Sequence, residues 1–397
     1  LLSDPGVRVH NARALTLLAD AGAPVDFAAQ VARIPEALVR AALASVPHEF
    51  DLYTLDGSPA VHYGGDAVHF DPGSSGMSIL DGSSGRQHAP VTADFVRWVR
   101  LVEALPQYDA QSTAFVCSDV PEDAGDWYRL YLALLHGRKP VVTGAFSKQG
   151  WWVMYEMLCA AAGGAEALRA KPLAVFDVCP SPPLLWSDLT CQNLMDCAER
   201  GVPAELISMP LAGAAAPVTL AAAVVQHAAE SLSGLVIHQL AGPGAPIVWG
   251  GAPAVFDMRT GVTPMGDAGT WLIDLAYVQL GKALGLPTHT YMGASDAKVV
   301  DAQAGFESGM SALLAVLRGV NMVSGAGMID YLRCVSFEKL VIDAEIIAAA
   351  RRVGEGITPR DQPLALDLIR TSGHKADYLS RPHTLKWFKK EMNIPSE

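Results

Sequence analysis

Short apolar runs recur along the middle of the chain, between residues 65 and 357, and each ends in small or polar residues. Between them lie segments of about 12–25 residues with helical periodicity. Alternating strands and helices predict parallel pairing through right-handed crossovers. Eight such units favour closure into a (β/α)8 TIM barrel over an open sheet. The predicted strands are 67–71, 109–115, 140–146, 173–179, 204–209, 246–250, 288–292 and 321–324.

The alternative α/β architecture is an open, doubly wound sheet. Such a sheet carries a glycine-rich phosphate loop directly after an early strand. The one candidate, Gly73-Ser74-Ser75-Gly76, lacks the G-x-G-x-x-G spacing. The barrel is therefore the preferred prediction.

Two flanking regions complete the predicted organisation. Residues 1–64 should form two helices, between residues 7 and 48, and then a β-hairpin turning at Asp56-Gly57. The barrel should occupy 65–357. Residues 358–397 should form a tail with a helix over 384–392, packed on the barrel or on a second subunit of a homo-oligomer.

Composition is consistent with this fold and narrows the function. The chain is 50% hydrophobic and only 18% charged, as expected for strands buried on both faces. Its net charge is −12 without a Lys/Arg block, which argues against nucleic-acid binding. No uninterrupted apolar run reaches the ~18 residues of a membrane span. We expect a cytoplasmic protein, with further residues beyond both of the abrupt chain ends.

The six cysteines give no evidence of a disulfide framework or a zinc site. None forms a C-x-x-C pair, and no histidine lies at a metal-ligand spacing from them. We therefore expect a reducing compartment and no metal bound by this chain. Cys117 and Cys179 lie near strand ends but have no neighbouring histidine, so a thiolate nucleophile is not favoured.

In a barrel, the active site forms at the carboxyl ends of the strands. Acidic and aromatic residues outnumber basic ones there, a combination that suits a cation without N–H groups better than a phosphate. Each aromatic could instead be packing, and His289 could point inward or outward. Asp177 interrupts an apolar strand, so it needs a partner or a function. The predicted substrate-binding residues are Asp71, Ser74, Phe115, Asp177, Trp186, Trp249, Tyr291, Asp296 and Tyr331.

Several longer motifs, in the right order along the chain, resemble the trimethylamine methyltransferase family. They are GLP at 285–287, SDAKVVDAQAGFE at 295–307, GG at 250–251 with FDMRTG at 256–261, SFEKLVIDAE at 336–345, and HTLKWF at 383–388. The resemblance covers essentially the whole chain. It implies a barrel enzyme that moves a methyl group from a methylated amine to the Co(I) of a separate corrinoid (cobalamin) protein.

One departure from the family pattern changes the expected substrate. Members acting on trimethylamine carry pyrrolysine near the seventh strand, where this chain has only ordinary residues over 291–295. The resemblance is therefore to the non-pyrrolysine branch, which implies a quaternary amine such as glycine betaine as substrate.

Two other functions stay open at this point. A barrel lyase or aldolase acting on a small acid would need a lysine inside the barrel or a bound metal, and Lys298 is the one candidate near a strand end. A non-catalytic quaternary-amine binding protein would instead close fully around its ligand.

Overall fold

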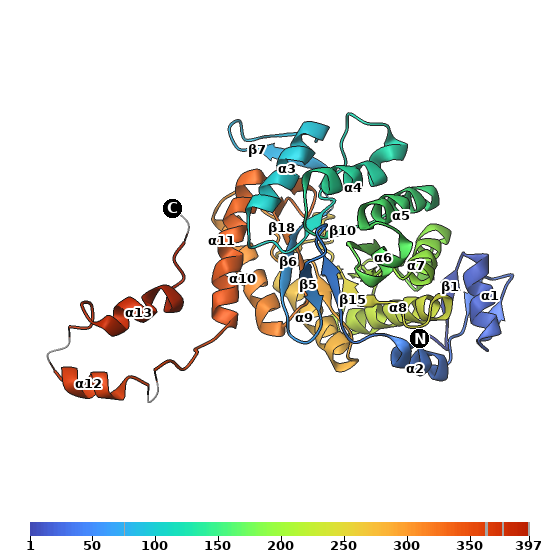
Figure 1. Ribbon diagram of the computed structural model, residues 1–397. Helices are drawn as coiled ribbons and strands as arrows, with labels where there is room; N and C mark the ends of the chain where they lie inside the picture. The colour runs from blue at the N-terminus through green and yellow to red at the C-terminus, as the bar shows by residue number, and fades with distance from the viewer. Residues whose placement is uncertain (75, 362–363, 375–376, 396–397) are drawn as a thin grey trace.

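The computed structural model describes residues 1–74, 76–361, 364–374 and 377–395 (Figure 1). Parallel strands lie at its centre, and all eight strands predicted from the apolar runs are present. They are β6 (His69–Pro72), β9 (Gln111–Ser112), β10 (Val141–Thr143), β11 (Ala174–Val178), β13 (Ala204–Ser208), β15 (Ile247–Gly251), β17 (His289–Thr290) and β18 (Met322–Ala326).

The eight strands belong to two parallel sheets, ordered β15-β13-β11-β10-β9 and β17-β18-β6. The edges of the two sheets meet at both junctions. Trp249 on β15 forms a parallel bridge with Thr288, next to β17. On the other side, the Asp109 amide before β9 donates a 2.8 Å hydrogen bond to the Phe70 carbonyl on β6.

A long helix follows each of these strands and covers the outside of the sheets (Figure 1). In each strand–helix unit, apolar side chains of the strand pack against the apolar face of the helix. One continuous hydrophobic core therefore lies between the strands and the helices. In chain order the helices are α3 (Thr92–Ala104), α4 (Gly125–His136), α5 (Lys148–Ala162), α7 (Asp188–Arg200), α8 (Leu220–Ala241), α9 (Ala268–Ala283), α10 (Ala302–Arg318) and α11 (Phe337–Gly354).

Helix α8 is long and apolar enough to cross a membrane by length and composition alone. Most of that stretch is buried inside the protein, and its buried positions include Glu230 and His238. Burial of this kind is typical of a core helix, and α8 packs against α7, α9 and β13.

The amino-terminal region contains both predicted helices, α1 (Ala12–Asp20) and α2 (Glu36–Ser45), and the predicted hairpin of β4 (Phe50–Tyr53) and β5 (Pro59–Tyr63). It also contains three short strands that the helical pattern did not predict: β1 (Val7–Val9), β2 (Val25–Asp26) and β3 (Val31–Ala32). The hairpin packs beneath the central strands, where Leu52, Val61 and Tyr63 contact Val142, Val175 and Val248.

The tail lies away from the rest of the molecule. Figure 1 shows α12 (Leu366–Ser372) and α13 (Pro382–Glu391) on an arm that extends beyond α11. None of the described residues of α13 is buried, and Glu391 at its end pairs with Arg352 of α11. A helix is thus present at the predicted place, largely exposed, and its contact with the rest of the chain is to α11 on the outside of the strands.

Candidate functional site

A cavity of about 210 Å³ lies at the carboxyl ends of β9, β10 and β11. Two larger hollows, of about 590 and 600 Å³, lie at the amino ends of the strands. Functional groups in α/β folds of this kind gather at the carboxyl ends, so the smaller cavity is the candidate site. Its polar lining includes Ser74, Thr113, Arg129, Asp177, Thr190 and Asn193.

Two carboxyl groups on neighbouring strands form a hydrogen-bonded pair at this cavity. Asp177 on β11 and Glu205 on β13 lie side by side in the parallel register, and their side chains share a hydrogen bond. The Tyr291 hydroxyl donates to Asp177 Oδ2 at 3.2 Å and lies 3.2 Å from Ser74 Oγ. From below, the Tyr63 hydroxyl donates to Glu205 Oε2 at 3.3 Å.

A third buried carboxyl, Asp71 at the end of β6, is linked to this pair through β17 and β18. The Ser324 hydroxyl donates to Asp71 Oδ1, and His289 Nε2 lies 3.0 Å from Ser324 Oγ and 3.3 Å from Glu205 Oε1. All four side chains are buried. The result is one polar network that crosses the interior between the strands.

Burial dominates the ionisation of this network because it disfavours charged forms. It raises the pKa of Asp177 to about 7, and it raises the pKa values of Asp71 and Glu205 well above their usual range. Burial also lowers the pKa of His289 to about 3, so this imidazole is neutral. Burial thus disfavours the charged form of all three acids, and the hydrogen bond between Asp177 and Glu205 favours the charge on Asp177 over Glu205.

Four of the predicted site residues belong to this hydrogen-bond network: Ser74 and Asp177 line the cavity, Tyr291 contacts both of them, and Asp71 is linked through Ser324 and His289. Asp177 was singled out as a carboxyl in an apolar strand, and the structure supplies its partners. His289, for which both directions were open, points inward, with its ring edge-on to Tyr291 at 4.9 Å.

Phe115, Trp186 and Trp249, also predicted to bind substrate, lie outside this cavity, because their rings pack outward against helices. Trp249 Nε1 donates to the Tyr277 carbonyl on α9, and a Cβ on Gly281 of that helix would come within 2.6 Å of the ring. Trp186 Nε1 donates to Ser233 of α8. Phe115 packs on Phe95 and Trp98 of α3, with ring centroids 5.3 and 5.8 Å away.

The remaining two candidates lie on loops around the site. The carboxylate of Asp296 accepts hydrogen bonds from the Met265 and Gly266 amides at 2.9 and 2.8 Å, which ties together the loops after β15 and β17. Tyr331 lies in a left-handed stretch, with Lys298 Nζ 4.1 Å from its ring centroid. Neither residue belongs to the cavity lining.

Two functional candidates were missed by the sequence reasoning. Glu205 interrupts the apolar run of β13 just as Asp177 interrupts β11, so the same argument would have identified it. Arg129 lies on α4 between apolar residues, and a helical position alone does not show that its guanidinium reaches the cavity.

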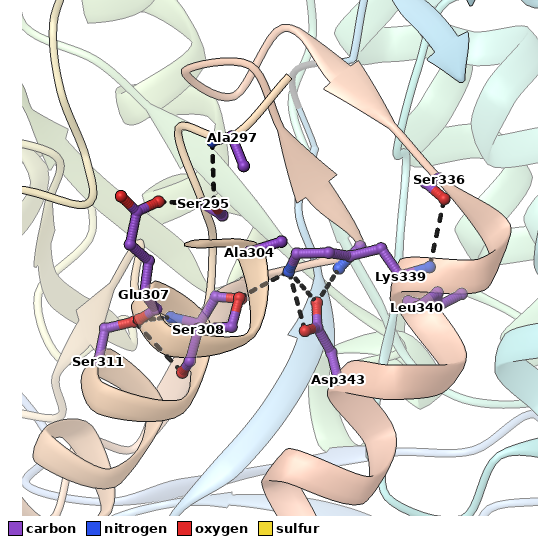
Figure 2. Close-up of polar contacts among 12 residues, drawn as sticks. Ser295, Ala297, Ala304, Glu307, Ser308, Ser311, Ser336, Lys339, Leu340 and Asp343 are labelled. Atoms are coloured by element: carbon purple, nitrogen blue, oxygen red, sulfur yellow. Dashed lines mark hydrogen bonds and ion pairs between the residues drawn. The ribbon is translucent and has the colours of Figure 1, made fainter. Parts of the chain in front are cut away.

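A second buried network holds the loops that frame the site (Figure 2). Lys339 Nζ on α11 donates to both oxygens of Asp343, at 2.8 and 2.6 Å, and to Ser308 Oγ of α10 at 2.6 Å. Ser308 Oγ in turn donates to the Gly293 carbonyl after β17, and Asp343 Oδ2 accepts from the Gly327 amide after β18. The two loops are thereby fixed to two helices.

Within the described part of the chain, no group of three or more His, Cys, Asp or Glu side chains is placed to bind a metal ion. All six cysteines are free thiols. Burial raises the pKa of Cys179 to about 12 and that of Cys117 to about 11, so both stay protonated near neutral pH.

Fold and site together define an α/β protein with a small cavity, lined by both Asp177 and Arg129, at the carboxyl ends of its parallel strands. The chain belongs to the trimethylamine methyltransferase (MTTB) family, whose model matches residues 1–396. The sequence resemblance to this family is thus confirmed.

Individual relatives agree with this assignment. The chain is 32% identical to trimethylamine methyltransferase MttB of Methanosarcina barkeri (strain Fusaro), over 97% of this chain and 79% of that protein. It is 30% identical to a glycine betaine methyltransferase of Desulfitobacterium hafniense (strain Y51), over 90% and 75%. The crystal structure of the Methanosarcina barkeri monomethylamine methyltransferase MtmB shares the fold, with a TM-score of 0.56 at 14% identity, over 87% and 73%.

Proposed function

We propose that this protein is a (β/α)8-barrel methyltransferase that moves a methyl group from a quaternary amine to the Co(I) of a partner corrinoid protein. The contacts at both sheet junctions support the closed barrel. Membership of the family and likeness to a glycine betaine methyltransferase support the reaction class. The reaction would take place in the cytoplasm, where free cysteines stay reduced.

The observation that carries the proposal is the ionisable Asp177 at a small cavity. A quaternary nitrogen has no N–H groups and cannot donate hydrogen bonds. A carboxylate or the electron-rich face of an aromatic ring can therefore recognise it only by its charge. Asp177 can supply that charge, and a hydrogen bond from the protonated form of Glu205, which burial favours, stabilises it. The Tyr291 hydroxyl also donates to Asp177, which fixes the carboxylate toward the cavity.

These residues bind and orient the substrate rather than transfer protons. When a methyl group leaves as a cation equivalent, the C–N electron pair stays on nitrogen and a neutral tertiary amine results. That leaving group needs no acid. The enzyme's contribution is to bind the quaternary ammonium by its positive charge. It also holds one methyl group toward the open end of the cavity, oriented for transfer.

A corrinoid, when brought by its partner, would supply the strongly nucleophilic metal that accepts the methyl group. The surface around the site fits the docking of another protein, because loops after several strands expose large apolar side chains. These side chains are Met77, Val116, Phe146, Met209 and Met258. In a homo-oligomer, a second copy of the chain would contact the extended arm that carries α12 and α13.

The lyase or aldolase alternative is not favoured by the position of Lys298. Its ammonium pairs with Asp330, stacks on Tyr331 and is more than half exposed, outside the cavity lining. A Schiff-base lysine would instead be desolvated and directed at the substrate.

The test is methyl transfer to free cob(I)alamin, followed by the absorbance change as methylcobalamin forms. The protein would be offered trimethylamine, tetramethylammonium and glycine betaine separately. We expect transfer from a quaternary compound and not from trimethylamine. Binding without transfer to either free cobalamin or a corrinoid protein would favour a non-catalytic binding protein.

Affinity for the quaternary ammonium should depend on pH, because only ionised Asp177 attracts the cation. Its pKa of about 7 in the free protein means that affinity should fall by up to about tenfold per pH unit below 7 and level off above it. Calorimetry from about pH 5.5 to about pH 8.5 would measure this. Affinity that stays constant over this range would show that Asp177 does not hold the cation.

A further inference from the structure

The arm formed by residues 358–397 exposes apolar side chains along its described length. Figure 1 shows it extending from the end of α11, away from the central strands. Its exposed large apolar residues are Leu364, Leu366, Ile369, Tyr378, Leu379, Leu385, Met392 and Ile394. Contiguous apolar surface of this kind is rare on monomeric soluble proteins and marks a place where another protein binds.

The two helices of the arm are too short to be stable without a partner. Helices α12 and α13 have seven and ten residues, and isolated helices below about 12–15 residues are marginal in water. On α13, Leu385, Phe388 and Met392 lie three and four residues apart, so they share one face. Leu385 is 77% exposed and Met392 is 61% exposed. This apolar face therefore needs a surface to cover it.

Helix α10 carries an exposed apolar stripe of matching length. Phe306, Met310 and Leu317 lie four and seven residues apart, so they share one face of α10. Their side chains are 61%, 39% and 63% exposed. At 1.5 Å per residue the stripe is about 16 Å long, and α13 is about 15 Å long. Leu317 also lines the hollow of about 600 Å³ that reaches Gly354 and Glu355, where the arm begins.

Charge favours contact between an arm and the rest of such a chain. The arm has seven Lys and Arg and five Asp and Glu, a net charge of +2. Because the whole chain has a net charge of −12, residues 1–357 have a net charge of −14. Opposite charges steer association and select the partner.

We propose that α13 packs along the α10 stripe of a second copy of this chain, in a two-fold symmetric dimer in which each arm covers the other copy. The end of α13 is held at the base of its own arm, where Glu391 pairs with Arg352 and Arg360, and its apolar face stays uncovered there. The hollow beside Leu317 lies at the same base, so two bases that face each other bring each arm to the other copy's stripe.

Symmetry and size favour a second copy over an unrelated protein. A two-fold dimer covers both arms and both stripes at once and leaves no arm free for further assembly. Stable interfaces engage about 20–30 residues on each side. Each arm has 40 residues, and the dimer uses two of them. The proposal does not depend on methyl transfer, so the proposed function and this interface can fail separately.

The test is the oligomeric state of the whole chain, measured by analytical ultracentrifugation over a range of concentrations. We expect the parent protein to be a dimer. Leu385→Glu on the arm and Leu317→Glu on α10 should each raise the Kd of the dimer at least about a hundredfold, because each change removes two apolar contacts of the symmetric interface. Leu135→Glu is the matched control, since Leu135 is a leucine of α4 that is 57% exposed. It should leave the Kd unchanged.

A cross-linking experiment identifies the two surfaces without disrupting them. A Leu385→Cys protein mixed with a Leu317→Cys protein should give a covalent dimer that contains one chain of each, when a short thiol cross-linker is added. Leu385→Cys mixed with Leu135→Cys should not. A parent protein that is monomeric at every concentration would overturn the proposal. So would a dimer that survives Leu385→Glu or Leu317→Glu, or a cross-link between Leu385→Cys and Leu317→Cys that forms only when both changes are in one chain.

Discussion

Replacing Asp177 with Asn is expected to lower kcat/KM for methyl transfer from a quaternary amine by at least about a hundredfold. The substitution keeps the shape and an acceptor for Tyr291, but it removes the negative charge of the Asp177 carboxylate. Loss of one partner of a buried charge pair typically costs about 2–5 kcal/mol, and a hundredfold corresponds to about 2.7 kcal/mol. Steady-state kinetics and calorimetry would measure the loss in turnover and in binding.

Two further variants show whether charge is the cause. Glu205→Gln should have a much smaller effect, because burial and Asp177 raise the pKa of Glu205 and so favour its uncharged form, and glutamine retains a donor toward Asp177. Asp274→Asn is the matched control. Asp274 is also a buried carboxyl with a strongly raised pKa, but it lies on α9 outside the cavity lining. Equal losses in all three variants would mean that structural damage, and not the charge at Asp177, explains the effect.

The architecture was predictable from sequence because buried parallel strands are encoded as apolar runs. All eight runs became strands, and the Asp56-Gly57 turn gave the expected hairpin. The short strands β1 to β3 were missed because two or three residues carry no periodicity. Small antiparallel strands on the loops after β6 and β18 were missed for the same reason.

The site was only partly predictable, because successive side chains of a strand point to opposite faces. Trp249 lies one residue before a strand position that faces inward. Its own side chain therefore faces outward, and the ring packs against α9. A wholly apolar run gives no sign of which face is inside. Charged residues give such a sign, since Asp177 and Glu205 could not face the apolar side of a helix without partners.

The network in Figure 2 leads to the second large effect: Lys339→Met should lower the free energy of unfolding by about 3–5 kcal/mol. The change leaves Asp343 buried without its countercharge, and it removes the donor that positions Ser308. Urea unfolding would measure the loss as a shift in midpoint at an unchanged slope. A loss below about 1 kcal/mol, the value typical of exposed ion pairs, would show that the pair contributes little.

Dependence on pH distinguishes an uncompensated charge from poor packing in the Lys339→Met variant. Burial already raises the pKa of Asp343 in the parent protein, and loss of Lys339 should raise it further. A raised pKa of Asp343 in the folded form means that the folded form holds the proton more tightly than the unfolded form. The loss in free energy of unfolding, relative to the parent protein, should therefore be smallest at low pH and grow as the pH rises through the pKa of Asp343. A double variant, Lys339→Met with Asp343→Leu, removes both charges and should recover much of the lost stability. It still leaves the Gly327 amide without its acceptor, so the loop after β18 should be looser and methyl transfer slower than in the parent protein. A deficit that is the same at every pH, and that persists in the double variant, would instead assign the role of Lys339 to packing.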